Sequence, residues 1–300
     1  MKLHTRLNLL VLATLAPMAL FAAVAALLLV QQERDTVARD AIGRARGAMS
    51  AIDTHLRASI ATLETLASFR ALEKGDIAMF HAESQRVLRT QPGWVNIGLS
   101  RTTDKLVLSN AVYAHGHPEP APNVDEESFD AVVRNARPAV GSVAAGTVVR
   151  SPTARVRVPV AYGEEVRYVI SAPLSLKYLS GLLEAQRVPE DSVIALVDRE
   201  KRVIARLPPV PAGVSEADSL HDVGESPGEG WFQGRTREGR SAYTAYVTSQ
   251  FSNWTLAISV PASTVEEGSR RTFLILTIGG VLALGIGLML AWHTARRLSG

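Results

Sequence analysis

The sequence predicts an α+β fold in which two antiparallel-sheet modules follow one long helix, with a membrane-spanning helix at each end. Three observations carry this prediction. Both ends of the 300-residue chain hold long apolar runs. An early segment repeats its apolar residues with the period of a helix, and a later, valine-rich region alternates with the period of a strand.

The two apolar runs cover residues 7–30 and 273–293. Each has about 20 or more residues without a charge, or roughly 30 Å of helix, which matches the thickness of a bilayer core. Basic residues without acids precede the first run, so the positive-inside rule places residues 1–6 in the cytoplasm. A cleaved signal peptide is the alternative, but its apolar region would be shorter. Two spans place residues 31–271 in a bacterial periplasm, outside the inner membrane.

Composition narrows the class of protein further. The formal net charge is only +3, and no basic stripe with interleaved aromatic residues is present, so we expect no nucleic-acid partner. The chain has no cysteine, which excludes disulfides, thiolate metal sites and cysteine nucleophiles. An outer region without disulfides must depend on its apolar core, as suits a periplasmic domain.

Residues 31–74 are expected to form one long signalling helix, which is most regular over residues 33–72. Apolar residues recur there at spacings of three and four, along one helical face: Ala41, Ala45, Met49, Ile52, Leu56, Ile60, Leu63 and Ala67. This stripe can cover its own domain, pack on a partner subunit, or do both. We expect a homodimer, because a paired helix gives its neighbour a reference for movement.

Residues 75–188 predict the first, membrane-distal module. The period-two pattern indicates an antiparallel sheet. Its expected helices are residues 77–88, 128–135 and 174–186, and its expected strands are 94–100, 106–108, 140–149, 154–161 and 166–173. The last of these helices should carry Leu174, Tyr178, Leu182 and Ala185 on one face.

Residues 189–262 repeat this plan in a smaller, membrane-proximal module. The expected strands are residues 192–197, 202–206, 231–235, 240–248 and 253–260, and residues 208–230 form a loop rich in Pro and Gly. A helix then begins at Ser263, with acids in its first turn where the helix dipole favours them. Residues 263–272 of that helix connect the module to the second span.

Four segments, in this order, carry a resemblance to a known family: residues 155–160 (RVRVPV), 168–174 (YVISAPL), 193–199 (VIALVDR) and 254–261 (WTLAISVP). Their order and spacing resemble the double Cache (dCache) sensor region of bacterial transmembrane receptors, with two PAS-like modules. Residues 294–300 are similar to the start of a HAMP linker. The resemblance implies signal transduction, most like that of a two-component sensor histidine kinase. A chemoreceptor, a diguanylate cyclase or a non-signalling anchored interaction domain are the alternatives.

In that family a small-molecule ligand usually lies between the membrane-distal sheet and its covering loops. The polar and aromatic residues offered by this sheet are Trp94, Asn96, Arg155, Arg157, Tyr168 and Ser171. Arg155 and Arg157 share a strand face, and a guanidinium can hold a carboxylate with two hydrogen bonds, which favours an anionic or zwitterionic ligand. The alternative is that both arginines face solvent. The family's amino-acid-binding signature cannot be laid onto these positions.

Other chemistry has little support in the sequence. His115, His117 and Glu119 could ligate a metal, but a solvated loop explains them better. No nucleophile motif and no glycine-rich phosphate loop stands in residues 1–300. We therefore expect no catalytic residue, metal or cofactor there, although a longer protein could continue into a kinase domain.

Overall fold

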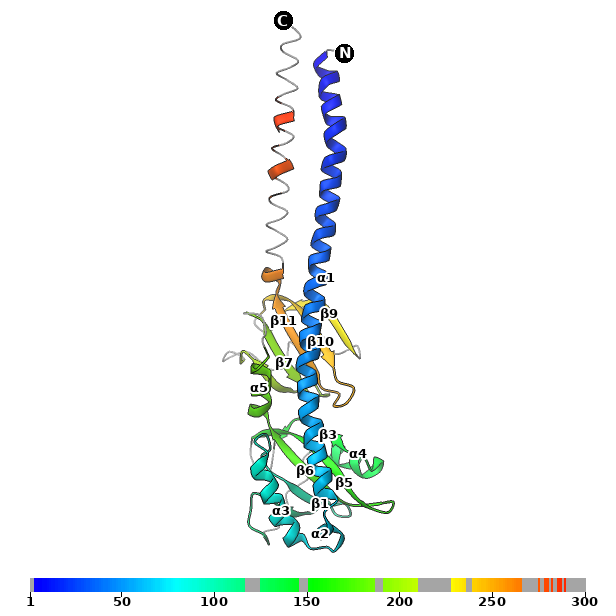
Figure 1. Cartoon of the computed structure of the whole chain (residues 1–300), viewed down its shortest axis with the longest axis vertical. Coiled ribbons are helices and arrows are strands. Elements are labelled where there is room, and N and C mark those ends of the chain that lie inside the picture. The colour runs from blue at the N-terminus through cyan, green and yellow to red at the C-terminus, as the bar shows by residue number, and fades with distance from the viewer. Residues whose placement is uncertain are drawn as a thin grey trace. The chain divides into compact units, whose positions relative to one another are not determined.

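The computed structural model describes residues 3–116, 125–145, 151–186, 191–209, 228–235 and 239–265, with separate helical positions between 275 and 289 (Figure 1). The chain forms two compact units. The first comprises residues 1–40 and 260–300, and the second comprises residues 41–259.

In the first unit, residues 3–40 are helical, and so are the described residues that follow the last strand, which ends at residue 261. Helix α1 (Leu3–Ala67) begins in this unit and continues into the second without a break. Residues 262–265 are helical, as expected for the start of the connecting helix. Over the described positions, no helix combines the length and apolar content that a membrane crossing requires. The segment compared with a HAMP linker lies outside the described residues.

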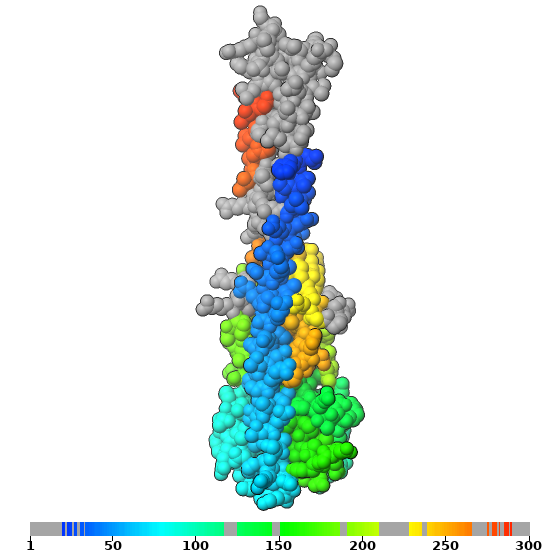
Figure 2. Space-filling view, turned by 45° about the vertical axis from the view of Figure 1, so that its right-hand side comes forward, coloured from blue at the N-terminus to red at the C-terminus, as the bar shows by residue number. Residues whose placement is uncertain are grey.

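In the second unit α1 supplies an apolar stripe to the core, which confirms the predicted helical period. Seven of the eight predicted positions, all except Ala67, are at least 93% buried. Figure 2 shows residues 41–67 of α1 running along the surface of this unit, flanked by later parts of the chain in cyan and green at the lower end and in yellow and orange above. The helix ends at Ala67 rather than at residue 72. The Ser68 hydroxyl bonds to the Thr65 carbonyl, and the Phe69 amide bonds to the Leu66 carbonyl, so the chain turns into the short helix α2 (Arg70–Glu73).

The first sheet is antiparallel and, within the described residues, has six strands in the order β2-β1-β6-β5-β3, with β4 also paired to β5. Its strands are β1 (Gly98–Arg101), β2 (Val107–Asn110), β3 (Ala139–Val140), β4 (Ala144–Ala145), β5 (Pro152–Tyr162) and β6 (Glu165–Ser175). The predicted long strand over residues 140–149 is instead two short strands, and residues 146–149 lie outside the described part.

Three helices accompany this sheet: α3 (Ile77–Thr90), α4 (Glu126–Asn135) and α5 (Leu176–Glu184). The predicted start and apolar face of α5 are wrong. Leu174 belongs to β6, and the Ser175 hydroxyl caps the helix by accepting from the Tyr178 amide. The helix therefore starts two residues later than expected and buries Leu179 and Leu183.

The second sheet is also antiparallel and, where the chain is described, has five strands in the order β8-β7-β11-β10-β9. Its strands are β7 (Val193–Val197), β8 (Val203–Leu207), β9 (Glu229–Arg235), β10 (Ser241–Thr248) and β11 (Thr255–Pro261). All five strands predicted within residues 189–262 are confirmed. The α+β fold with two antiparallel sheets is therefore as the sequence predicts.

Candidate functional site

Strand β5 carries valines on one face and polar side chains on the other. Its polar face holds Thr153, Arg155 and Arg157, and Ser171 lies directly opposite Arg157 on the neighbouring strand β6. We call these four residues the polar row. All are at least 92% buried, so the alternative that both arginines face solvent is wrong.

Each of the three guanidinium nitrogens of Arg157 donates a hydrogen bond to a described residue. Its Nε donates to the Ser128 hydroxyl at 2.8 Å, and its Nη1 donates to the Ser171 hydroxyl at 3.1 Å. Its Nη2 donates to the Asp125 carbonyl at 3.3 Å. The guanidinium also lies over the Phe129 ring, 5.6 Å from its centroid. Arg157 therefore fastens the start of α4 to the sheet.

Arg155 is less completely satisfied. Its Nη1 is buried and has no hydrogen-bond partner among the described residues, and the same holds for Thr153 Oγ1 and Asn96 Oδ1. Buried polar atoms in folded proteins are nearly always paired, so these three atoms mark where an additional polar group would be stabilised.

The electrostatics of the two arginines have one main cause, which is burial. Burial lowers the pKa of Arg157 to about 10; Asp125 opposes this shift, and the like charge of Arg155 adds to it. Burial also lowers the pKa of Arg155, against the attraction of Asp125. With a pKa near 10, Arg157 is charged at neutral pH.

Asp125 is the acid that attracts the Arg157 charge most strongly, and its backbone is unusual. Its φ of 61° is left-handed, which is uncommon for a residue with a side chain. Its Oδ2 accepts from the Ser128 hydroxyl at 2.6 Å, and only 4% of the side chain is exposed. A Cβ on Gly141 would lie 1.9 Å from that oxygen, so the glycine makes room for the carboxylate.

Two predicted site residues lie away from the polar row. The Trp94 indole nitrogen donates to the Ser59 hydroxyl of α1 at 3.1 Å, so the ring points toward the long helix. Tyr168 is three residues before Ser171 on β6, and strand alternation places it on the opposite face. The structure thus groups Arg155, Arg157 and Ser171, and it separates Trp94 and Tyr168 from them.

Of the residues considered as metal ligands in the sequence, His115 is described, and its ring contacts the ring of His81 on α3. His81 and His115 have ring centroids 5.4 Å apart, and the His81 Nδ1 lies 3.0 Å from the Ser109 hydroxyl oxygen. His117 and Glu119 lie outside the described residues. In the part of the chain that the structure covers, no three His, Cys, Asp or Glu side chains are placed to share a metal.

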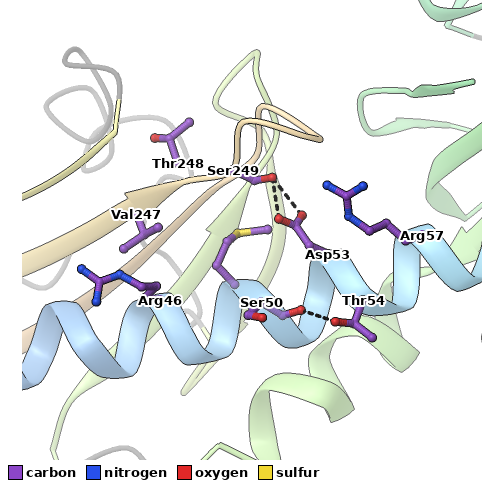
Figure 3. A pocket seen from close by; sticks show the side chains of 9 residues that line it. Arg46, Ser50, Asp53, Thr54, Arg57, Val247, Thr248 and Ser249 are labelled. Carbon is purple, nitrogen blue, oxygen red and sulfur yellow. Dashed lines mark hydrogen bonds between the residues drawn. The ribbon is translucent and has the colours of Figure 1, made fainter. Parts of the chain in front are cut away.

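Away from the polar row, a hollow with a volume of about 370 Å³ lies between α1 and the end of β10 (Figure 3). Its charged residues are already paired. Asp53 accepts from the Ser249 hydroxyl at 2.7 and 2.9 Å, Arg46 binds Glu229, and the Arg57 guanidinium lies 4.0 Å from the Phe251 ring centroid. These contacts fasten α1 to the second sheet, so we interpret the groove as a structural junction.

Neither the known protein families nor the curated proteins contain a match to this sequence. Solved structures do match its fold. The extracellular domain of a protein assigned as a histidine kinase is 13% identical, with a TM-score of 0.58 over 74% of this chain and 95% of that one. The PctB amino-acid chemoreceptor domain of Pseudomonas aeruginosa, solved with L-Arg, is 14% identical, with a TM-score of 0.60 over 77% and 97%.

A third similar structure is the ligand-binding domain of the Campylobacter jejuni chemoreceptor Tlp3 with L-norvaline. It is 11% identical and has a TM-score of 0.59 over 78% of this chain and 94% of that one. At such identities the comparison shows the fold alone. That fold is shared by the sensor domains of histidine kinases and of chemoreceptors, and the comparison does not distinguish these two classes.

Sequence reasoning missed Asp125, Ser128 and Thr153. An Asp followed directly by two Glu residues and a helical pattern is a visible signal of a helix start. Thr153 could have been found from its spacing of two from Arg155. The position of the Asp125 carboxylate has no such signal, because it depends on the space left by Gly141.

Proposed function

We propose that the chain is the ligand-sensing and membrane-anchoring part of a bacterial signal-transduction receptor. The apolar runs 7–30 and 273–293 anchor it in the inner membrane, and residues 31–271 face the periplasm. Support comes from the shared sensor-domain fold and from the apolar ends of the sequence. A dimer and an output domain of the histidine-kinase type complete the proposal, and a chemoreceptor or a diguanylate cyclase is the alternative output.

The unpartnered Nη1 of Arg155 carries the proposed binding site. A ligand carboxylate would accept the hydrogen bond that this buried guanidinium donates to no described residue. The Asn96 amide oxygen could accept from a donor group on the same ligand. Each guanidinium nitrogen of Arg157 already donates to the protein, so its role is to position the site. The proposed ligand is a small molecule with a carboxylate.

Ligand binding would be transmitted to the membrane by the connecting helix, residues 263–272, and the second span. A ligand that binds one packing arrangement of the first sheet more tightly than another shifts the balance between the two. The last strand and the connecting helix would pass this change to the second span as a displacement of roughly 1–2 Å, which is sufficient in known helix switches.

The test is a thermal-shift screen of the full 300-residue chain in lipid nanodiscs. The probes are small carboxylic acids, amino acids, amines and sugars. We expect a carboxylate to raise the melting temperature, and the rise should grow with the logarithm of its concentration once that exceeds the dissociation constant. Arg155→Gln should weaken the binding of that carboxylate by about 100-fold, because a charged hydrogen bond in a buried site is lost.

Arg167→Gln is the matched control, since Arg167 lies on the neighbouring strand and its side chain is 54% exposed. It should leave the affinity for the carboxylate unchanged. Stabilisation by amines or sugars alone, or equal affinity in wild-type protein and Arg155→Gln, would refute the proposed site.

A further inference from the structure

The turn between β7 and β8 is fastened to the first sheet by a fully buried carboxylate. Asp198 Oδ1 accepts from the backbone amides of Glu200 at 2.8 Å and Arg202 at 2.9 Å. Its Oδ2 accepts from the amide of Val143 at 2.8 Å, which lies between β3 and β4. The turn therefore belongs to the second sheet and is bonded to a segment of the first.

The next residue, Arg199, reaches further toward the polar row. Its Nε donates to the Ser142 hydroxyl at 3.1 Å. Its Nη2 lies 3.0 Å from Glu127 Oε2 and 3.9 Å from Asp125 Oδ1. That nitrogen is buried, yet it makes no well-aligned hydrogen bond to any described residue. Arg199 is attracted to both acids but held by neither in a directional bond.

The local charge is unbalanced around Asp125. Its carboxylate attracts the buried Arg155 and Arg157, and it is also the buried acid beside Arg199. The side chains of Glu127 and Asp130 are 68% and 40% exposed, so solvent screens their charges more strongly. One buried carboxylate thus divides its attraction among three guanidinium groups.

We propose that Asp125 is the coupling residue between the ligand site and the second sheet. When an anion neutralises Arg155, the Asp125 carboxylate is attracted less strongly to the polar row and moves toward Arg199. The 3.9 Å contact then shortens to a hydrogen-bonded ion pair, and the β7–β8 turn is held more tightly. This regulation rests on the proposed function of the polar row.

The turn is well placed to pass the change onward. Strand β7 pairs with β11 from Val193↔Ser259 to Val197↔Thr255. Strand β11 is followed at once by the helical residues 262–265. A tighter β7–β8 turn therefore constrains the strand that leads to the C-terminal helix.

The coupling can be tested without a ligand, by hydrogen–deuterium exchange of the full chain in nanodiscs. Arg155→Gln removes the charge that an anion would neutralise. We expect amide exchange in residues 198–203 to slow about three- to tenfold, as for the gain of one partly buried ion pair. Arg155→Lys keeps the charge and should leave this exchange unchanged.

The same substitution is then made in two backgrounds. In Arg199→Gln the slowing should disappear, because the cation that Asp125 approaches is gone. In Arg202→Gln it should persist, because Arg202 bonds only to Asp198 and Glu200 of its own turn among the described residues. No slowing in Arg155→Gln, or equal slowing in the Arg199→Gln background, overturns the proposal.

Asp125→Asn gives a second test that does not depend on whether Arg155→Gln folds. It should speed exchange in residues 198–203 in the wild-type background and have no further effect in Arg199→Gln. Equal acceleration in both backgrounds overturns the coupling. Since no ligand is used, a failed ligand screen and a failed coupling test are separate results.

Discussion

The two sheets treat their buried polar side chains differently. On the second sheet the hydroxyls of Thr244 and Ser259 lie 2.8 Å apart, and Thr248 and Thr255 form another pair at 3.0 Å. Arg206, on the same sheet, donates to the Pro208 carbonyl at 2.8 Å. The first sheet instead leaves polar atoms of Thr153, Arg155 and Asn96 without partners in the described chain.

We infer from this difference that the first sheet forms the ligand site and that the second sheet is a scaffold. A polar residue that bonds to a protein neighbour costs little to bury, whereas an unpartnered buried donor costs about 1–3 kcal/mol. The first sheet bears that cost at Arg155, and a ligand can remove it. On the strands of the second sheet the hydroxyls of Thr244, Thr248, Thr255 and Ser259 are paired with one another, which suits an element that only transmits a change. The unpartnered Ser192 Oγ and Arg199 Nη2 lie just outside these strands. The following substitutions test this comparison, from the largest expected effect to the smallest.

Asp198→Ala should have the largest effect on stability. Its carboxylate has no exposed surface, and its removal leaves the amides of Val143, Glu200 and Arg202 without their acceptor. We expect a loss of about 3 kcal/mol in the free energy of unfolding, measured by denaturant titration. Glu200→Ala, at a 46% exposed side chain in the same turn, should cost less than about 1 kcal/mol. Equal costs would show that the turn is not held by Asp198.

Trp94→Phe tests the division within the first sheet. The change removes the hydrogen bond to Ser59 but keeps most of the ring, so we expect a loss of about 1 kcal/mol in stability. Ligand affinity should not change, because the indole faces α1. Asn96→Leu should instead weaken ligand binding. A weaker ligand affinity in Trp94→Phe would place that ring in the site after all.

Thr244→Val combined with Ser259→Ala tests whether the second sheet is only a scaffold. Replacing both partners of a hydroxyl pair removes donor and acceptor together, so the free energy of unfolding should change by less than about 1 kcal/mol. Calorimetric melting checks this, and ligand affinity should be unaltered. Impaired ligand binding in the double variant would mean that this sheet also forms a site.

Acidification should have the smallest effect. Burial and the nearby His115 lower the pKa of His81, against a backbone hydrogen bond at Tyr113, and burial lowers the pKa of His55. The unfolded chain then binds protons first as the pH falls below about 6.5, so stability present above that pH is lost below it. The melting temperature should fall by the order of 1 °C between pH 7 and 5.5, and less in His81→Gln. A melting temperature that rises on acidification contradicts this.

Much of the fold could be predicted because periodicity reports which face is buried. The stripe on α1 and the strands of the second sheet follow directly from spacings of 3.6 and 2 residues. The α5 face was misassigned because a strand and a helix share the segment around Leu174, and only the cap at Ser175 decides where the helix begins.

The site was harder to predict because its face assignments depend on an irregular segment. Alternation along β5 correctly grouped Arg155 with Arg157, and pairing with β6 added Ser171. Trp94 precedes β1 and makes only an isolated bridge to Leu174, so alternation from β1 did not apply to it. The contact between Asp125 and Arg199 joins residues 74 positions apart, and no local pattern encodes it.

Because Gly141 has no side chain, the contacts of Asp125 can be disturbed by adding volume at position 141, without changing any charge. Alanine at position 141 would act as a steric wedge, because the added methyl group must occupy the seat of the Asp125 carboxylate. Such a chain would keep every charge of the natural sequence and still be forced out of its resting arrangement.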